Sequence, residues 1–147
     1  MIRRFVGARL VLAIVIFAAA FAAAPAAQLS TSVVMTGLDN PRGLAIGPEG
    51  ALYVAEAGRG GTGPCVFLAG VAQLRCYGPS GAISRLWRGE QTRVLTGLPT
   101  HASATGEANG PNDISFQGLG NAYITLGLGG TPDEREACRR DPYSARW

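Results

Sequence analysis

The chain has 147 residues, of which 47% are apolar and 16% charged, a composition typical of one small folded domain and not of a disordered segment. Its formal net charge of +3 comes from three arginines near the N-terminus. The rest of the chain holds ten arginines, no lysine and ten acidic residues. Because that part is neutral, attraction to nucleic acid through general basic charge is excluded as its function.

The first 27 residues have the pattern of a secretory signal peptide. Three arginines precede the apolar run Leu10–Ala24, and small residues end at Ala27, directly before Gln28. The apolar run is shorter than the roughly 20 residues that a membrane-spanning helix needs. We therefore predict cleavage after Ala27, in preference to an uncleaved anchor. The protein is expected to be secreted, extracellular or periplasmic, and to meet a membrane only during export.

Residues 28–131 are the part of the chain in which short antiparallel strands are expected. Glycine-containing turns separate short runs in which apolar and polar residues alternate. In chain order, the expected elements are a β-rich run (Ser32–Thr36), a hairpin (residues 43–47 and 51–57), a loop-like insertion (Gly60–Ser80), a third strand (Ala82–Trp87) and a fourth strand (Thr92–Thr96).

The expected hairpin returns 70 positions later without a gap. Equivalent positions carry Pro41 and Pro111, Leu44 and Ile114, Ile46 and Phe116, Gly50 and Gly120, Tyr53 and Tyr123, and Val54 and Ile124. In the same way, Ser32–Leu38 resembles Thr92–Leu98. We interpret these matches as an internal repeat. A unit of four antiparallel strands joined by glycine-rich turns is the blade of a β-propeller.

The expected fold is therefore all-β, with one four-stranded blade and the first hairpin of the next. The run Ser32–Thr36 would complete the outer edge of the last blade and so close the ring. A propeller needs about four to eight blades, so residues 28–131 are interpreted as an incomplete propeller in a truncated chain. Residues 132–147 do not continue the repeat and are expected to form a polar tail, for which an aberrant sequence is one interpretation.

Two cysteines, Cys65 and Cys76, lie in the expected insertion. We predict a disulfide between them, because an exported chain enters an oxidising environment. A zinc site is disfavoured, since the chain has a single histidine, His101, and no Cys-x-x-Cys pair. Cys138 is left without a predicted partner.

Five polar residues are candidates for a binding site: Arg42, Glu56, Arg59, Asn112 and Asp113. Arg42 and Asn112 are equivalent in the repeat and precede the inner strand, where the loops of a propeller line the mouth of its channel. Oxygen atoms of Glu56, Asn112 and Asp113 suit Ca²⁺ or another divalent cation. Two alternatives stay open. Asn112 and Asp113 can bond the backbone of a turn, and Glu56 and Arg59 can form a pair that stabilises a loop.

No catalytic triad and no phosphate-binding loop is expected. His101 is predicted in a solvated Ser/Ala loop, Leu98–Ala104, which lacks the pattern of a nucleophile elbow. The glycine-rich stretch Gly58–Gly63 lacks the Lys-Ser/Thr ending of a phosphate-binding loop. Three arginines are predicted on a solvated outer face of the sheet: Arg85, Arg88 and Arg93.

Ordered blocks of sequence extend between residues 33 and 131. They are Thr36–Ala45, Tyr53–Gly61, Gly63–Cys65, Cys76–Ala82 and Gly110–Gly118. Together they resemble the N-terminal part of the ScyD/ScyE family, exported proteins predicted to be β-propellers and named for members linked to scytonemin biosynthesis. The resemblance implies a longer relative, of which this chain would be roughly the first third. Asn112 stands where the family pattern has histidine, and the residues after Pro132 depart from the pattern.

Two classes of function follow from these expectations. The first is an exported, non-catalytic binding or accessory protein of the ScyD/ScyE type, with a small molecule, a polysaccharide or a protein as its ligand. The second is a metal-dependent hydrolase or lactonase resembling the gluconolactonase-like propellers, in which a central cation activates water. The neutral charge and the lack of a recognisable nucleophile favour the first class.

Overall fold

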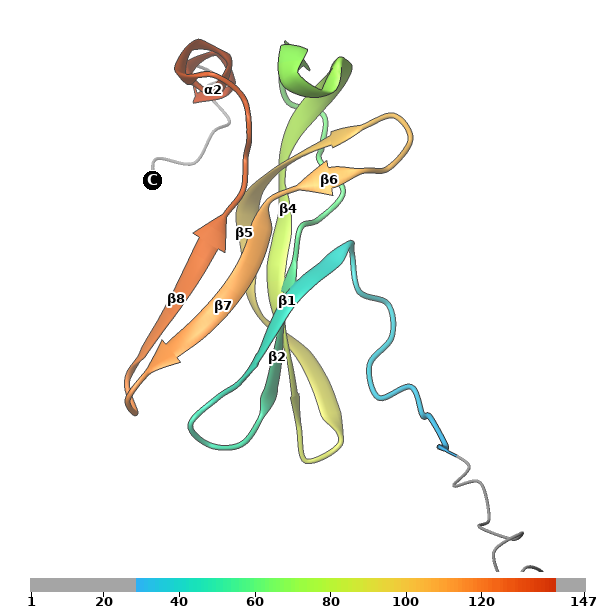
Figure 1. The fold of residues 1–147 in the computed structure, drawn as a ribbon, viewed down its shortest axis with the longest axis vertical. Coiled ribbons are helices and arrows are strands. Elements are labelled where there is room, and N and C mark those ends of the chain that lie inside the picture. The colour runs from blue at the N-terminus through green and yellow to red at the C-terminus, as the bar shows by residue number, and fades with distance from the viewer. Residues whose placement is uncertain (1–28, 140–147) are drawn as a thin grey trace, which may run out of the picture. The chain divides into compact units, whose positions relative to one another are not determined.

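A computed structural model describes residues 29–139 (Figure 1). The predicted signal peptide and residues 140–147 of the predicted tail lie outside the described residues. The strands are β1 (Pro41–Ile46), β2 (Leu52–Glu56), β3 (Cys65–Leu68), β4 (Gln73–Trp87), β5 (Glu90–Ser103), β6 (Ala108–Asn109), β7 (Pro111–Gln117) and β8 (Asn121–Leu126). The helices are a short 3₁₀ helix η1 (Ala69–Val71) and α2 (Pro132–Arg139). Within the described part, no helix is long and apolar enough to cross a membrane.

The predicted all-β class is confirmed. One sheet has the strand order β1-β2-β4-β5-β6, with β3 paired to β4, and β7 and β8 form a separate two-stranded sheet. Every pairing between these strands is antiparallel. Among the described strands neither sheet closes on itself.

The two predicted hairpins are present, and they repeat in register as well as in sequence. In the first, Pro41 faces Glu56, Leu44 faces Val54 and Ile46 faces Leu52. In the second, each of these partnerships recurs 70 positions later: Pro111 faces Leu126, Ile114 faces Ile124 and Phe116 faces Ala122. A register shift follows the initial proline in both. The repeat therefore fixes the same local geometry twice.

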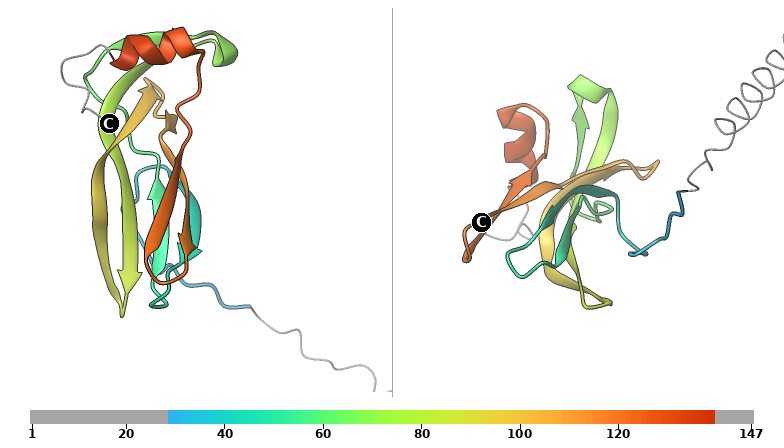
Figure 2. Two further views of the ribbon diagram at one scale, coloured as in Figure 1. Left: turned by 90° about the vertical axis from the view of Figure 1, so that its left-hand side faces the viewer. Right: turned by 60° about the horizontal axis from the view of Figure 1, so that its bottom comes forward.

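The core lies where the β7–β8 hairpin packs against one face of the larger sheet. Buried Ala55, Ile83 and Ile114 form its centre. The partly buried side chains around them are Ala45, Tyr53, Leu98, Phe116 and Ile124. The rings of Tyr53 and Phe116 meet with their centroids 4.8 Å apart. Both views in Figure 2 show the two hairpins side by side. The apolar side chains of the second hairpin share one cluster with side chains of the first.

The predicted loop-like insertion, Gly60–Ser80, is wrong in part. Residues 65–68 form β3. Strand β4 begins at Gln73 and is therefore much longer than the expected third strand, Ala82–Trp87. The backbone around Gly61 packs closely against β4, because a Cβ atom on Gly61 would lie 2.7 Å from the Cα of Gly78. Glycine at these two positions lets the segment before β3 lie directly on β4.

The predicted strand Ser32–Thr36 is absent, since residues 29–40 contain no strand. A side chain takes over the hydrogen bonds that a strand would make. Gln91 Nε2 donates to the carbonyl of Thr36 at 2.8 Å, and the Thr36 N–H donates to Gln91 Oε1 at 3.1 Å. This single amide binds Thr36 beside the start of β5 without a ladder.

The predicted polar tail begins with an ordered helix, α2. Thr131 caps it, because its hydroxyl accepts the N–H of Glu134 at 3.3 Å while the Glu134 carboxylate accepts the N–H of Thr131 at 2.5 Å. This reciprocal arrangement is a capping box. The other carboxylate oxygen of Glu134 accepts the N–H of Ala69 at 3.2 Å. One side chain thus starts α2 and ties it to η1.

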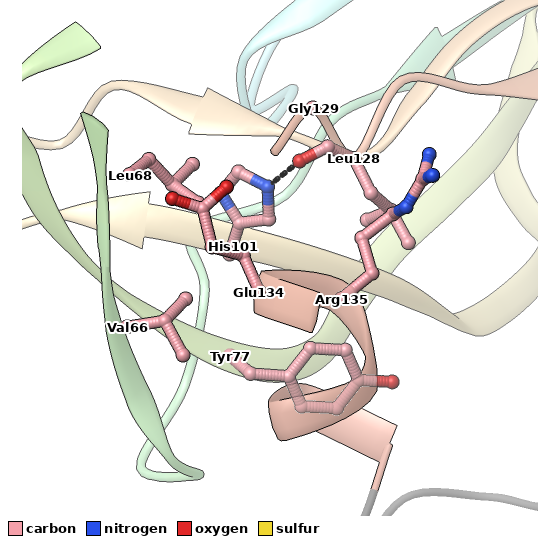
Figure 3. Close-up of a pocket in the computed structure, with 8 residues that line it drawn as sticks. All are labelled: Val66, Leu68, Tyr77, His101, Leu128, Gly129, Glu134 and Arg135. Atoms are coloured by element: carbon pink, nitrogen blue, oxygen red, sulfur yellow. Dashed lines mark hydrogen bonds between the residues drawn. The ribbon is translucent and has the colours of Figure 1, made fainter. Parts of the chain in front are cut away.

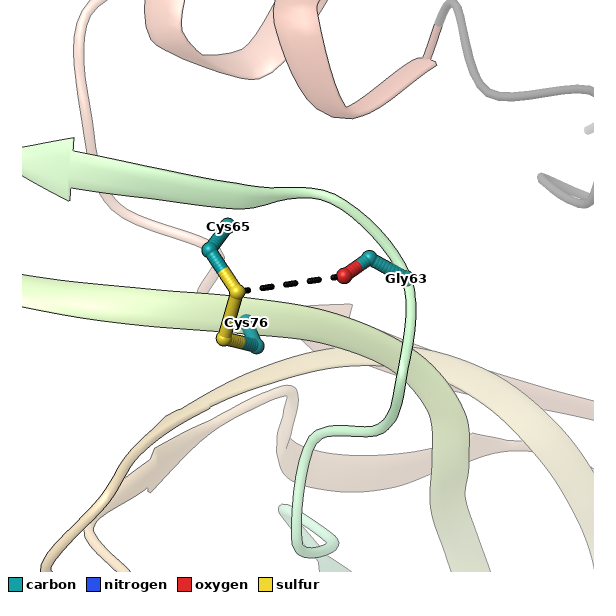
Figure 4. The surroundings of a disulfide bond; sticks show 3 residues. All are labelled: Gly63, Cys65 and Cys76. Carbon is teal, nitrogen blue, oxygen red and sulfur yellow. Dashed lines mark hydrogen bonds between the residues drawn. A yellow bond between two sulfur atoms is a disulfide. The ribbon is translucent and has the colours of Figure 1, made fainter.

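The predicted disulfide between Cys65 and Cys76 is confirmed (Figure 4). The two residues face each other across β3 and β4, with their Cα atoms 3.9 Å apart. The bond closes the hairpin that projects from the larger sheet. It also fixes the register of a strand pair that few buried side chains hold, since Phe67 and Leu74 are both exposed.

We expect the double variant Cys65→Ser/Cys76→Ser to lower the free energy of unfolding by roughly 3 kcal/mol, because the unfolded chain gains the freedom of the opened loop. Urea unfolding followed by circular dichroism would measure the loss. Intact mass before and after reduction would check that the wild-type chain carries the bond. An unchanged midpoint in urea would contradict this role of the disulfide.

Candidate functional site

A buried carboxylate, Glu56, lies at the centre of a network of hydrogen bonds in the larger sheet. It is the last residue of β2 and is fully buried. Its Oε1 accepts hydrogen bonds from the Ser84 hydroxyl at 2.5 Å and from Arg93 Nε at 3.1 Å. Its Oε2 accepts from Arg93 Nη2 at 2.8 Å and from the Asp39 N–H at 2.6 Å. Glu56 therefore joins β2, β4, β5 and the segment before β1.

A second carboxylate, Asp39, extends this cluster towards solvent. Its Oδ1 accepts from Arg59 Nε at 2.7 Å, and Arg59 Nη2 forms an ion pair with the same oxygen. Its Oδ2 lies 3.1 Å from Arg93 Nη2. The Asp39 side chain is 13% exposed and that of Arg59 is 74% exposed. We call Asp39, Glu56, Arg59, Ser84 and Arg93 the ion-pair cluster.

The electrostatics around Glu56 and Arg93 favour the charged states of these two residues. Burial alone raises the pKa of Glu56, but hydrogen bonds from Arg93, Ser84 and the Asp39 N–H outweigh burial and hold the pKa below its usual value. In turn, the hydrogen bond to Glu56 raises the pKa of Arg93. A carboxylate held ionised and fully occupied by donors is a poor general acid or base at neutral pH. Its chemistry is that of a structural anchor.

Three of the predicted site residues lie at the starts of β1 and β7. Arg42 is the second residue of β1, and Asn112 and Asp113 are the second and third of β7. All three are exposed. A Cβ on Gly43 would overlap the carboxylate of Asp113 and approach the carbonyl of Asn112 to 2.9 Å, so the two strand starts are in contact. We call Arg42, Asn112 and Asp113 the strand-start group.

The hydrogen bonds of the strand-start group leave much of its capacity open to solvent. Arg42 Nη2 donates to the carbonyl of Ala108 at 2.8 Å. One oxygen of Asp113 accepts the N–H of the next residue, Ile114, at 2.9 Å. This bond to the backbone is the alternative to cation binding that the sequence left open for Asp113, and it uses one carboxylate oxygen.

The structure separates the five predicted site residues into two sets. Glu56 and Arg59 belong to the ion-pair cluster, but they are not paired with each other, because Arg93 bonds Glu56 and Asp39 bonds Arg59. The sequence interpretation missed the residues that complete this cluster: Asp39, Ser84 and Arg93. Arg93 was predicted on a solvated face; its side chain is 40% exposed, yet its guanidinium bonds the buried carboxylate. The alternation of strand residues, which places Glu56 and Ser84 on one face, was the available signal.

His101 is buried, not solvated, so that prediction is wrong. It lies inside β5, is 3% exposed, and its Nε2 bonds the carbonyl of Leu128 (Figure 3). Burial lowers the pKa of His101, so the ring is neutral at neutral pH. The adjoining cavity measures about 30 Å³, which is far below the size of a site for a small organic ligand.

Within residues 29–136, whose side chains the structure describes, no three His, Cys, Asp or Glu residues lie close enough together to hold a metal ion. Asn112 and Asp113 offer exposed side-chain oxygen atoms, but both residues belong to one strand, β7.

Comparison of the chain with models of protein families, with curated proteins and with solved structures found no match.

We expect Glu56→Gln to lower the free energy of unfolding at neutral pH by roughly 2 to 4 kcal/mol, because Arg93 loses its buried counter-charge. The pKa of Glu56 in the folded protein lies below the usual glutamate value of 4.5. The charged form therefore adds stability above that pH, and this gain is lost as the pH falls through the folded pKa. The difference between wild type and variant should shrink in acid. Urea unfolding at neutral pH and at several values below 4.5 would measure it.

Arg59→Ala is the matched control for this variant. Arg59 also pairs with a carboxylate, but its side chain is largely exposed, so the expected loss is below about 1 kcal/mol. Equal losses for the two variants would contradict the assignment of Glu56 as the anchor of the cluster.

Proposed function

We propose that the protein is an exported, non-catalytic binding protein whose hairpins are arranged as blades of the β-propeller type. The observation that carries this proposal is the repeat of the two hairpins in identical register, with the second packed face to face on the first. Successive blades of a propeller are repeated antiparallel sheets that stack in this way around an axis. The resemblance of the sequence blocks to the ScyD/ScyE family supports the same architecture.

Export is supported by two independent features. The N-terminal pattern of arginines, apolar run and small residues is that of a secretory signal. The disulfide between Cys65 and Cys76 would be stable in an oxidising compartment.

The strand-start group supplies the proposed binding surface. It offers exposed guanidinium and amide donors together with carboxylate and amide acceptors, from strands that are equivalent in the repeat. Such a mixture, on a protein whose residues 28–147 have no net formal charge, suits a ligand rich in hydroxyl groups. Among the small molecules, polysaccharides and proteins that sequence analysis left open, we propose a polysaccharide. The ion-pair cluster supports this surface, because Glu56 faces Pro41, the residue before Arg42.

Affinity electrophoresis of the full chain, produced in a secreting bacterial host, would test the proposal. Alginate and a neutral β-glucan, each cast into a native gel, are the probes. We expect at least one polymer to retard the protein, and Arg42→Ala/Asn112→Ala to lose at least about tenfold in affinity, since two directional hydrogen-bonding groups of about 1 kcal/mol each are removed. The control Arg88→Gln removes an exposed arginine outside the strand-start group and should leave the retardation unchanged.

Two results would overturn the proposal. The first is mobility that neither polymer alters. The second is hydrolysis of a sugar lactone that a chelator abolishes and that Asp113→Ala removes, because this would show the metal-dependent hydrolase expected as the second class. N-terminal sequencing of the same preparation would test export separately, with Gln28 expected as the first residue.

A further inference from the structure

The contact between the two hairpins is built from two complementary surfaces. The β7–β8 hairpin contributes Ile114, Phe116 and Ile124, and the larger sheet receives them on Ala45, Tyr53, Ala55 and Ile83. Ile114 is only 4% exposed as a result. We call the first surface the apolar face and the second the receiving face.

The repeat places a second apolar face on the first hairpin. Leu44 and Ile46 are the equivalents of Ile114 and Phe116, 70 positions earlier. They point away from the core, since Ala45 between them packs into it and strand residues alternate between faces. Leu44 is 65% exposed and Ile46 is 63% exposed. Two large apolar side chains are thus uncovered at positions that are covered in the other hairpin.

The second hairpin, in the same way, carries a second receiving face. Tyr123 is the equivalent of Tyr53 and Ser115 the equivalent of Ala45. These two residues face each other across β7 and β8, on the side opposite to Ile114 and Phe116. Tyr123 is 52% exposed. Its ring is therefore available for a contact like the one that Tyr53 makes with Phe116.

We propose that a second copy of this chain covers these faces, with Leu44 and Ile46 of one copy packed on Tyr123 of the next. The contact within the chain is the template, because Leu44, Ile46 and Tyr123 are the repeat equivalents of Ile114, Phe116 and Tyr53, which belong to that contact. The two surfaces differ, so the contact is heterologous, and repetition of it generates a closed ring or an open filament. This inference concerns how copies associate and does not depend on the proposed ligand.

A mixing experiment on the full chain, produced in a secreting host, tests this arrangement. One variant, Leu44→Asp/Ile46→Asp, blocks the apolar face, and another, Tyr123→Asp, blocks the receiving face. Each substituted side chain is more than half exposed, so the fold should persist, and circular dichroism would check it. The wild-type mass from light scattering should rise with concentration, and each variant alone should remain a monomer.

The equimolar mixture of the two variants is the decisive sample. Each variant retains the face that the other has lost, so we expect a dimer with one copy of each and nothing larger. Leu74→Asp, an equally drastic change at a residue 57% exposed on β4, is the matched control and should associate as the wild type does. A monomeric wild type, variants that associate alone, or a mixture that stays monomeric would each overturn the proposal. A wild-type protein that associates but binds no polysaccharide would overturn the proposed function and leave this proposal standing.

Discussion

The larger sheet depends on the burial of one ionised carboxylate. Glu56 is fully buried, and its two oxygens bind groups from the segment before β1, from β4 and from β5. A buried charge without such partners would cost several kcal/mol. The partners must therefore stay in place whenever Glu56 is charged, which restricts the register of three strands at once. Apolar packing alone would restrict it less, because the buried core of this sheet is rich in small residues such as Ala55 and Ala57.

Local features of the sequence were enough to predict the two hairpins. Alternation of apolar and polar residues and a glycine turn lie within about fifteen residues, and such patterns specify a hairpin with little help from the rest of the chain. The contact of Arg93 with Glu56 could not be predicted in this way. It depends on the pairing of β4 with β5, whose register shifts at three places between Gly78 and Ser84. No local sequence pattern reveals those shifts. Arg93 was therefore predicted to lie on the solvated face of the sheet.

The environment of His101 shows the same limit for a single residue. Its neighbours are small, and a stretch such as Ala102 and Ser103 is typical of a loop. In the structure it belongs to β5, and the carbonyl that it bonds belongs to Leu128, 27 positions later. Thr131 and Glu134 have the spacing of a capping box, but they lie where the repeat ends, so the repeat itself does not predict α2. A sequence repeat predicts the contacts that recur in each unit. Contacts found in one unit alone depend on three-dimensional packing, which the repeat does not predict.

The strand-start group and the two exposed faces use different parts of the same hairpins, and this separation has a consequence for binding. Arg42 and Asn112 lie at the ends of their strands, whereas Leu44, Ile46 and Tyr123 lie within them. In the contact within the chain the starts of β1 and β7 also touch, because a Cβ on Gly43 would overlap the carboxylate of Asp113. A copy packed in the same way would therefore bring its own strand start beside Asp113. Because equivalent hairpins would follow one another in the same orientation, each added copy would place another strand-start group along the same edge. A long polymer of sugars offers many equivalent sites, so several weak contacts would act together and raise the overall affinity well above that of one group.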